Sequence, residues 1–181
     1  MKILVLATDI PATSQMPGSP RLFNLCRELA RHHELVLIAR CSSQERYSTY
    51  LDDPASPRVF KRIEILPEPS SPSWWGRHRH RVRGSAYFET RFRYPEYHRA
   101  VCETIRTLCN EEQIDLIYVD LLVMTQYVDP GLRIPAIVDL HDSLTHLATR
   151  MFRSEREWRK RLSAYRFLRS VRRLERVLGK V

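Results

Sequence analysis

Lys2-Ile-Leu-Val-Leu-Ala7 opens the chain with a short apolar run, and a Pro- and Gly-containing loop, an amphipathic segment and a second apolar run follow up to Ala39. A short run of branched apolar residues is typical of a strand buried on both faces of a parallel sheet. Ser19 followed by Pro20 is an N-cap with proline at the first helical position. Apolar residues then recur at helical spacing: Leu22, Leu25, Cys26, Leu29 and Ala30. The pattern predicts strand, loop, helix and strand, a right-handed crossover with its loop at the carboxyl edge of the sheet, where open α/β folds bind ligands.

The rest of the chain continues this alternation. Strands are predicted at 34–39, 59–66, 114–119 and 135–140, and helices at 42–53, 95–111, 121–127 and from 143 or 144 almost to the end, with a turn at 129–131. One apolar stripe is expected on the last helix: Trp158, Leu162, Tyr165, Leu168, Val171, Leu174 and Leu178. The order predicts the α/β class, a Rossmann-like, mostly parallel sheet with helices on both faces, in one domain over 1–181.

The composition is basic, since 30 Lys and Arg against 21 Asp and Glu give a net charge of +9. This balance indicates attraction to phosphate-rich or other anionic surfaces, while solvated helix faces account for the arginines equally well. The four cysteines lack the CxxC spacing, so buried free thiols in a reducing compartment are expected. No apolar run approaches the roughly 20 residues that span a bilayer, and the start has no signal-peptide pattern. The sequence therefore predicts a cytoplasmic protein.

A basic aromatic insertion at about 73–94 departs from the surrounding pattern. It interleaves aromatic side chains with cations, among them Trp74, Trp75, Arg77, Arg79 and Arg81. Such a segment can make membrane contact, with tryptophans at headgroup depth and arginines on anionic lipid, which predicts a peripheral protein on the inner face of the membrane. A lid packed on its own domain is the alternative. Binding of nucleic acid is the weaker interpretation, because no nucleic-acid-binding motif accompanies the charge.

The first candidate site is the turn before the first helix. Gly18 and Ser19 at a helix N-terminus can present backbone N–H groups to an anion. A turn for Gly18 and a cap for Ser19 are the plain structural alternatives. The loop has neither GxGxxG nor GxxxxGKS, which argues against nucleotide binding of those two kinds.

The second candidate site follows the strand at 135–140. His141 can hydrogen-bond a sugar hydroxyl or accept a proton near neutral pH, and Asp142 can orient it or bind a hydroxyl itself. Capping of the next helix is the alternative for Asp142 and Ser143. Asp120, at another strand end, is interpreted as a cap of the following turn. No metal site is predicted, since no carboxylate cluster accompanies the histidines.

The chain resembles glycosyltransferase family 4 enzymes of the GT-B fold, of the exopolysaccharide type. The resemblance rests on residues 1–39 with Gly18-Ser-Pro-Arg21, on Asp115-Leu-Ile-Tyr-Val119, on 137–143 and on the ending at 173–181. It implies the N-terminal, acceptor-binding half of an enzyme that transfers a sugar from a nucleotide sugar to a glycan or lipid-linked acceptor, with retention and without a metal or other cofactor. The C-terminal domain that holds the nucleotide sugar is absent from this chain, so the chain alone is expected to be inactive.

The resemblance also implies roles for individual residues. Gly18 and Ser19 would lie against the donor diphosphate or the acceptor, and Arg21 matches an arginine often found after the glycine loop. His141 matches the histidine near the reacting sugar, with Asp142 beside it. The paired glycines common in the family are reduced here to Gly18. A non-catalytic Rossmann-like binding or regulatory domain is the alternative function.

Overall fold

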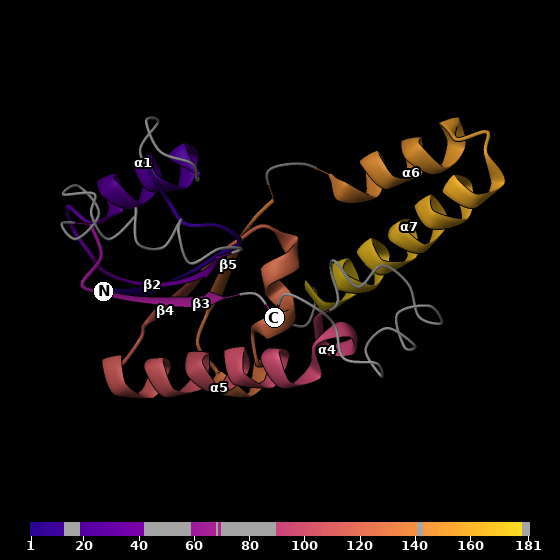
Figure 1. Ribbon diagram of the computed structural model, residues 1–181. Helices are drawn as coiled ribbons and strands as arrows, with labels where there is room; N and C mark the ends of the chain where they lie inside the picture. Colours follow the sequence, from indigo (N-terminus) through magenta and orange to yellow (C-terminus); the bar gives the residue numbers. More distant parts are fainter. Residues whose placement is uncertain (13–18, 42–58, 68, 70–89, 141–142, 179–181) are drawn as a thin grey trace.

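The computed structural model describes residues 1–12, 19–41, 59–67, 69, 90–140 and 143–178. Within these ranges, five parallel strands form one sheet in the order β3-β2-β1-β4-β5 (Figure 1). The strands are β1 (Lys2–Ala7), β2 (Glu34–Cys41), β3 (Arg62–Pro67), β4 (Leu116–Asp120) and β5 (Ala136–Asp139). The predicted α/β, Rossmann-like class is therefore confirmed.

Strand β1 lies at the centre of the sheet, between β2 and β4. Leu4 is opposite Val36 of β2 and Ile117 of β4. Both faces of β1 are buried, which explains why its sequence is a continuous apolar run rather than an alternation of apolar and polar residues.

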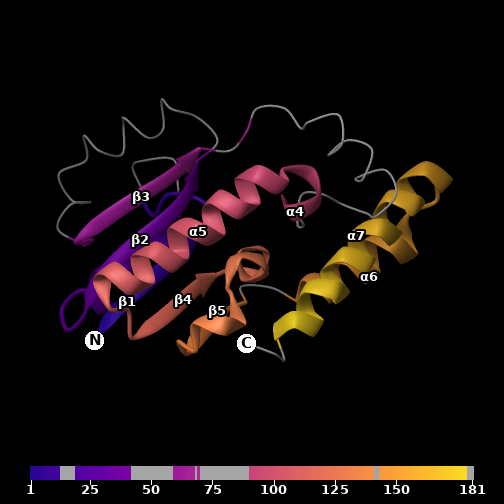
Figure 2. The same cartoon turned by 90° about the horizontal axis from the view of Figure 1, so that it is seen from below.

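One helix covers each face of the sheet (Figures 1 and 2). Helix α1 (Pro20–Leu29) packs Cys26 and its neighbours against Val5 on one side. Helix α5 (Pro95–Glu112) packs Ile105 against Leu4 on the other side. Successive residues of β1 therefore serve opposite cores, as the period of two in a strand requires.

The start of α1 agrees with the sequence prediction. The Ser19 hydroxyl accepts a hydrogen bond from the Leu22 backbone N–H at 3.4 Å, and Pro20 occupies the first turn. The Ser19 backbone N–H donates to the Ile10 carbonyl at 3.1 Å, which ties the helix start to the chain leaving β1. The N-cap interpretation of Ser19 is confirmed.

Short helical turns connect the larger elements. The predicted helix at 121–127 is a 3₁₀ helix, η2 (Leu122–Tyr127), and the predicted turn at 129–131 lies in a second one, η3 (Pro130–Leu132). Leu121, between β4 and η2, has a φ of 67°. This left-handed conformation turns the chain sharply at the carboxyl end of β4, although it is unfavourable for a branched side chain.

The C-terminal part corrects the prediction of one long helix. Two helices, α6 (Leu144–Ser154) and α7 (Trp158–Leu178), form a hairpin that projects from the sheet (Figures 1 and 2). Glu155 is extended between them, and its carboxylate accepts a hydrogen bond from the Glu157 backbone N–H at 3.1 Å. The break contains neither Pro nor Gly, so the usual breaker signals are missing. The Thr145 hydroxyl donates to Glu175 at 2.6 Å and links the two helices.

The single apolar stripe expected on the last helix is also wrong. Leu168, Val171 and Leu174 are buried, whereas Trp158 and Tyr165 are exposed. Because a helix turns by about 100° per residue, repeated steps of three residues move a stripe around the helix by roughly 60° at each step. The apolar residues of α7 therefore divide between an inner and an outer face.

Several predictions lie outside the described residues. These are the helix at 42–53 and the part of the basic aromatic insertion up to residue 89, while residues 90–93 form the short helix α4 (Thr90–Arg93).

Cys26, Cys102 and Cys109 are free thiols, and burial, with a smaller contribution from Asp120, raises the pKa of Cys26 to about 12. None of the helices in the described ranges combines the length and apolarity needed to span a bilayer.

Candidate functional site

The strand order places the polar pair Thr8 and Asp120 at the point where the chain crosses from one half of the sheet to the other. The chain passes from β1 to β2 on one side and returns to β4 on the other, so the carboxyl ends of β1 and β4 border the crevice where open α/β folds bind ligands. There the Thr8 hydroxyl donates to Asp120 Oδ2 at 3.0 Å. Asp120 is 2% exposed. A carboxylate at this depth requires hydrogen-bond donors, and Thr8 supplies one.

A second carboxylate lies one strand further along the same edge. Asp139, at the end of β5, is opposite Asp120 in the strand register. The Tyr118 hydroxyl donates to Asp139 Oδ2 at 2.6 Å. Arg21 Nη2 lies 3.2 Å from Oδ1 and 3.1 Å from Oδ2 of the same carboxylate. Three elements, α1, β4 and β5, thus fix the position of Asp139.

Burial and a hydrogen bond set the protonation state of the phenol in this cluster. Burial, followed by the hydrogen bond to Asp139, raises the pKa of Tyr118. The phenol therefore remains a neutral donor. Arg21 supplies a permanent positive charge, and its side chain is 59% exposed. Because a guanidinium carries five N–H donors and the contacts to Asp139 use Nη2, the remaining donors can bind a phosphate or a hydroxyl.

Two of the predicted site residues are described, and the structure brings them to this edge. Ser19 caps α1, and Arg21, in its first turn, reaches Asp139, two residues before His141 in the sequence. Ser143 caps α6 by accepting a hydrogen bond from the His146 backbone N–H at 3.3 Å. The other predicted site residues lie outside the described residues: Gly18, His141, Asp142, Trp74, Trp75, Arg77, Arg79 and Arg81.

Four residues of this edge were not predicted as site residues from the sequence: Thr8, Tyr118, Asp120 and Asp139. The cap interpretation of Asp120 is wrong, because its carboxylate accepts from Thr8 and Leu121 stands at the N-cap position of η2. Polar residues at the ends of three predicted strands were the available signal. Their pairing depends on strand order, which no local pattern specifies.

A second polar cluster joins α4, α5 and η2. The Thr90 hydroxyl lies 2.7 Å from the Tyr127 hydroxyl, and the Thr90 backbone N–H donates to Gln126 Oε1 at 2.8 Å. His98 Nε2 lies 3.1 Å from the Gln126 carbonyl, which can only accept, so Nε2 carries a proton. Burial lowers the pKa of His98. The cluster is suited to anchoring helices with neutral groups, and no three His, Cys, Asp or Glu residues gather to hold a metal ion in the described part of the chain.

Comparisons with known proteins identify the fold. No family model matches the chain, and no curated protein matches it. UGT2 of Phytolacca americana, solved with UDP-2-fluoro-glucose and pterostilbene, superposes with a TM-score of 0.52 at 15% identity, over 96% of this chain and 46% of that one. A UGT transferase of Siraitia grosvenorii, solved with UDP, gives a TM-score of 0.47 at 17% identity, over 86% of this chain and 32% of that one.

Both matches cover only part of the solved structures. The chain spans less than half the length of either solved glycosyltransferase. At such low identity the similarity concerns the arrangement of strands and helices. The chain therefore shares its Rossmann-like arrangement of strands and helices with part of the Phytolacca americana protein.

Proposed function

We propose that this chain is the acceptor-binding, N-terminal half of a retaining glycosyltransferase that transfers a sugar from a nucleotide sugar to a glycan or lipid-linked acceptor. The resemblance to family 4 enzymes of the exopolysaccharide type supports the retaining mechanism and the acceptor class. The observation that supports the site is that Arg21 and Tyr118 both contact Asp139 at the carboxyl edge of the sheet. In the sequence, His141 and Asp142 follow Asp139 by two and three positions.

Each group has a role in this proposal. His141 hydrogen-bonds or deprotonates a hydroxyl near the reacting sugar, and Asp142 orients it. Arg21 uses its remaining donors to bind a phosphate or an acceptor hydroxyl while Asp139 holds its guanidinium in place. Gly18 and Ser19 lie against the same anion at the start of α1, where Ser19 donates through its hydroxyl proton because its backbone N–H is bound to the Ile10 carbonyl. The chain needs no metal, because the guanidinium and the helix N-terminus supply positive potential.

A second domain is part of this proposal. The two solved glycosyltransferases are more than twice as long as the matched region, and both contain a UDP moiety. We expect the donor to bind chiefly to a second domain, so that the chain alone is inactive. The proposal places the enzyme in the cytoplasm, in contact with the inner face of the membrane through Trp74, Trp75, Arg77, Arg79 and Arg81.

The experiment joins the chain to a C-terminal donor domain and measures transfer from a panel of nucleotide sugars. His141→Ala should lower kcat by about 10²- to 10⁴-fold, the usual contribution of a general acid or base. Arg21→Gln should lower kcat/KM by roughly tenfold or more, because a charge-assisted contact is lost. Arg31→Gln is the matched control, since Arg31 lies just beyond the other end of α1 and pairs with Glu28 at 2.7 Å.

The configuration of the product tests the mechanism separately. NMR of the newly formed linkage should show retention of the donor's anomeric configuration. Inversion would contradict the family 4 assignment while leaving glycosyl transfer intact. Transfer that is unchanged in His141→Ala would contradict the proposed site, and no transfer from any donor would favour the non-catalytic binding domain.

A further inference from the structure

One exposed face of α7 is apolar near the tip of the hairpin and cationic toward its base. Near the tip of the hairpin this face carries Trp158, which is 68% exposed, with Leu162 and Tyr165 at 41% and 47%. The same face continues toward the base with Arg169, Arg172 and Arg176, again at intervals of three or four residues. A single helix surface therefore presents a large apolar area beside a row of cations. The inner face of α7 already supplies its packing, so the fold does not require this outer pattern.

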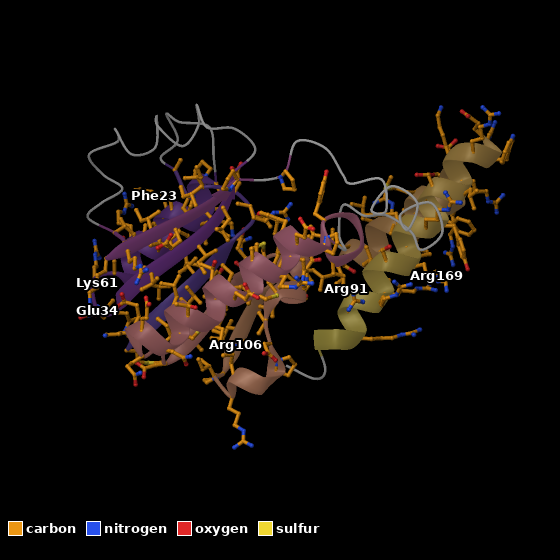
Figure 3. All side chains as sticks on the ribbon, turned by 60° about the horizontal axis from the view of Figure 1, so that its bottom comes forward. Phe23, Glu34, Lys61, Arg91, Arg106 and Arg169 are labelled. Atoms are coloured by element: carbon orange, nitrogen blue, oxygen red, sulfur yellow. The ribbon has the colours of Figure 1, made fainter. Side chains whose placement is uncertain are left out.

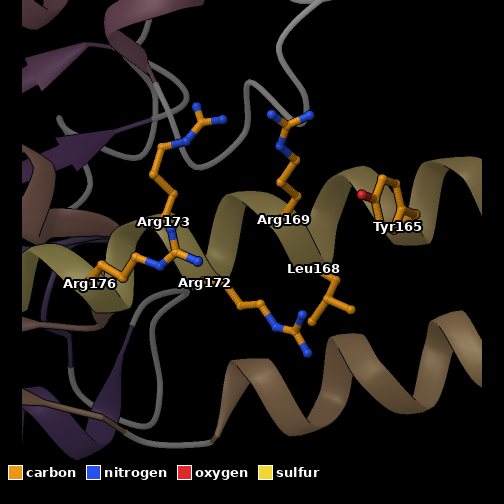
Figure 4. Close-up of a pocket in the computed structure, with 6 residues that line it drawn as sticks. All are labelled: Tyr165, Leu168, Arg169, Arg172, Arg173 and Arg176. Carbon is orange, nitrogen blue, oxygen red and sulfur yellow. The ribbon is translucent and has the colours of Figure 1, made fainter.

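The cationic end of this face forms a pocket of about 300 Å³ (Figure 4). Its lining consists of Tyr165, Leu168, Arg169, Arg172, Arg173 and Arg176. Figure 4 shows Arg169 and Arg173 extending to one side of the helix and Arg172 to the other, and all three belong to the lining of the pocket. Planar guanidinium groups match the oxygen atoms of a phosphate and bind them through paired hydrogen bonds.

The charge of the whole hairpin supports an anionic ligand. Residues 144–178 contain eleven Lys and Arg and three Glu, which gives +8 of the net +9 of the chain. The hairpin projects from the sheet, so this charge is presented away from the domain (Figure 1). A concentration of one sign of charge attracts polyanionic surfaces over distances beyond direct contact.

We propose that the α7 pocket binds the phosphate group of an anionic lipid, with Trp158, Leu162 and Tyr165 inserted at the headgroup boundary. Tryptophan and tyrosine favour this boundary because their rings are apolar and their N–H or O–H groups stay hydrated. Leu147 and Met151 of α6 are also exposed and enlarge the apolar area of the hairpin. A soluble phosphate would use the arginines and leave the apolar residues without a role. The inference goes beyond the proposed function and holds whether or not the chain takes part in glycosyl transfer.

The first experiment measures sedimentation of the 181-residue chain with phosphatidylcholine vesicles, with and without phosphatidylglycerol. The chain should bind the anionic vesicles and should be released by salt. The triple variant Arg169→Gln, Arg172→Gln, Arg176→Gln should bind about 100-fold more weakly, since each cation at a membrane surface contributes about fivefold. The control triple Arg27→Gln, Arg31→Gln, Arg99→Gln removes the same charge from exposed positions of the sheet region and should lose less than about tenfold. Equal losses of vesicle affinity in the two triple variants would contradict the assignment of lipid binding to the pocket.

The second experiment needs no change in the pocket. In a Trp74→Phe, Trp75→Phe variant, Trp158 is the remaining tryptophan, and its emission should shift to shorter wavelength on anionic vesicles. The absence of a shift would overturn insertion of the hairpin. Inorganic pyrophosphate that binds with the same dependence on Arg169, Arg172 and Arg176, without vesicle binding, would reassign the pocket to a soluble phosphate and overturn the lipid proposal. Tighter binding of an oligonucleotide than of vesicles would do the same.

Discussion

The sheet region, which includes α1 and α5, differs from the hairpin of α6 and α7 in the pairing of its charges and in the exposure of its apolar side chains. In the sheet region several cations are paired: Lys61 lies 3.3 Å from Glu34 (Figure 3), and Arg62 lies 2.8 Å from Glu111. The hairpin instead carries most of the net charge and five of the eight large apolar residues that are exposed in the described ranges. Burial explains nearly every apolar residue of the sheet. It explains only the inner face of the hairpin, so the outer face calls for a functional explanation.

The largest expected difference concerns apolar truncation in the two regions. Ile117→Ala should lower the free energy of unfolding by about 2–5 kcal/mol, because Ile117 is fully buried between β1 and β5 and leaves a cavity. Leu162→Ala on the outer face of α7 should change it by less than about 0.5 kcal/mol. Urea denaturation of both variants makes the comparison. Similar losses would show that the outer face is packed in solution.

A charge introduced at the base of the hairpin should destabilise the hairpin and leave the sheet folded. Val171 is fully buried in the cluster that contains η2. Val171→Asp should destabilise the docking of α7 by about 3 kcal/mol, since an unpaired charge would replace an apolar contact. Arg172→Asp, one residue further and exposed, is the control. Hydrogen exchange should show lost protection in α6 and α7 and retained protection in β1 and β4. Uniform loss across the chain would show that the regions unfold as one unit.

A smaller effect is expected at the carboxyl edge. Tyr118→Phe removes the hydrogen bond to Asp139 and should cost about 1.5–3 kcal/mol, the range for a bond to a charged group. Arg21→Gln should cost less than about 1 kcal/mol, because the Arg21 side chain is mostly exposed. Thermal unfolding of the two variants gives the order. The reverse order would mean that the ion pair, rather than the phenol, fixes Asp139.

The smallest effect concerns pH. Burial lowers the pKa of His98, with a further lowering by Arg91, so the folded state takes up a proton less readily than the unfolded state. Stability should therefore be retained above the ordinary histidine pKa of about 6.5 and should fall as the pH drops below it. His98→Gln should flatten the part of the stability profile that lies below about pH 6.5. An unchanged slope in the variant would assign the acid sensitivity to other groups.

Local signals predicted much of the sheet region. The apolar run of β1, the Ser19 cap with Pro20 and the stripe of α5 each depend on neighbours in sequence, and the structure confirms all three elements. The hairpin break at Glu155 carries no breaker residue and was missed. The Thr8–Asp120 bond joins residues 112 positions apart, so it depends on strand order. Candidate site residues could be placed at strand ends from the sequence, but their partners could not.

The most direct test of the glycosyltransferase assignment compares the isolated chain with the same chain joined to a C-terminal donor domain, using the same nucleotide sugars and acceptors. We expect no transfer by the isolated chain and transfer by the joined protein, with loss of transfer in His141→Ala. Transfer by the isolated chain would contradict the division of the site between two domains. Undiminished transfer by the joined His141→Ala protein would contradict the placement of the site at the carboxyl edge.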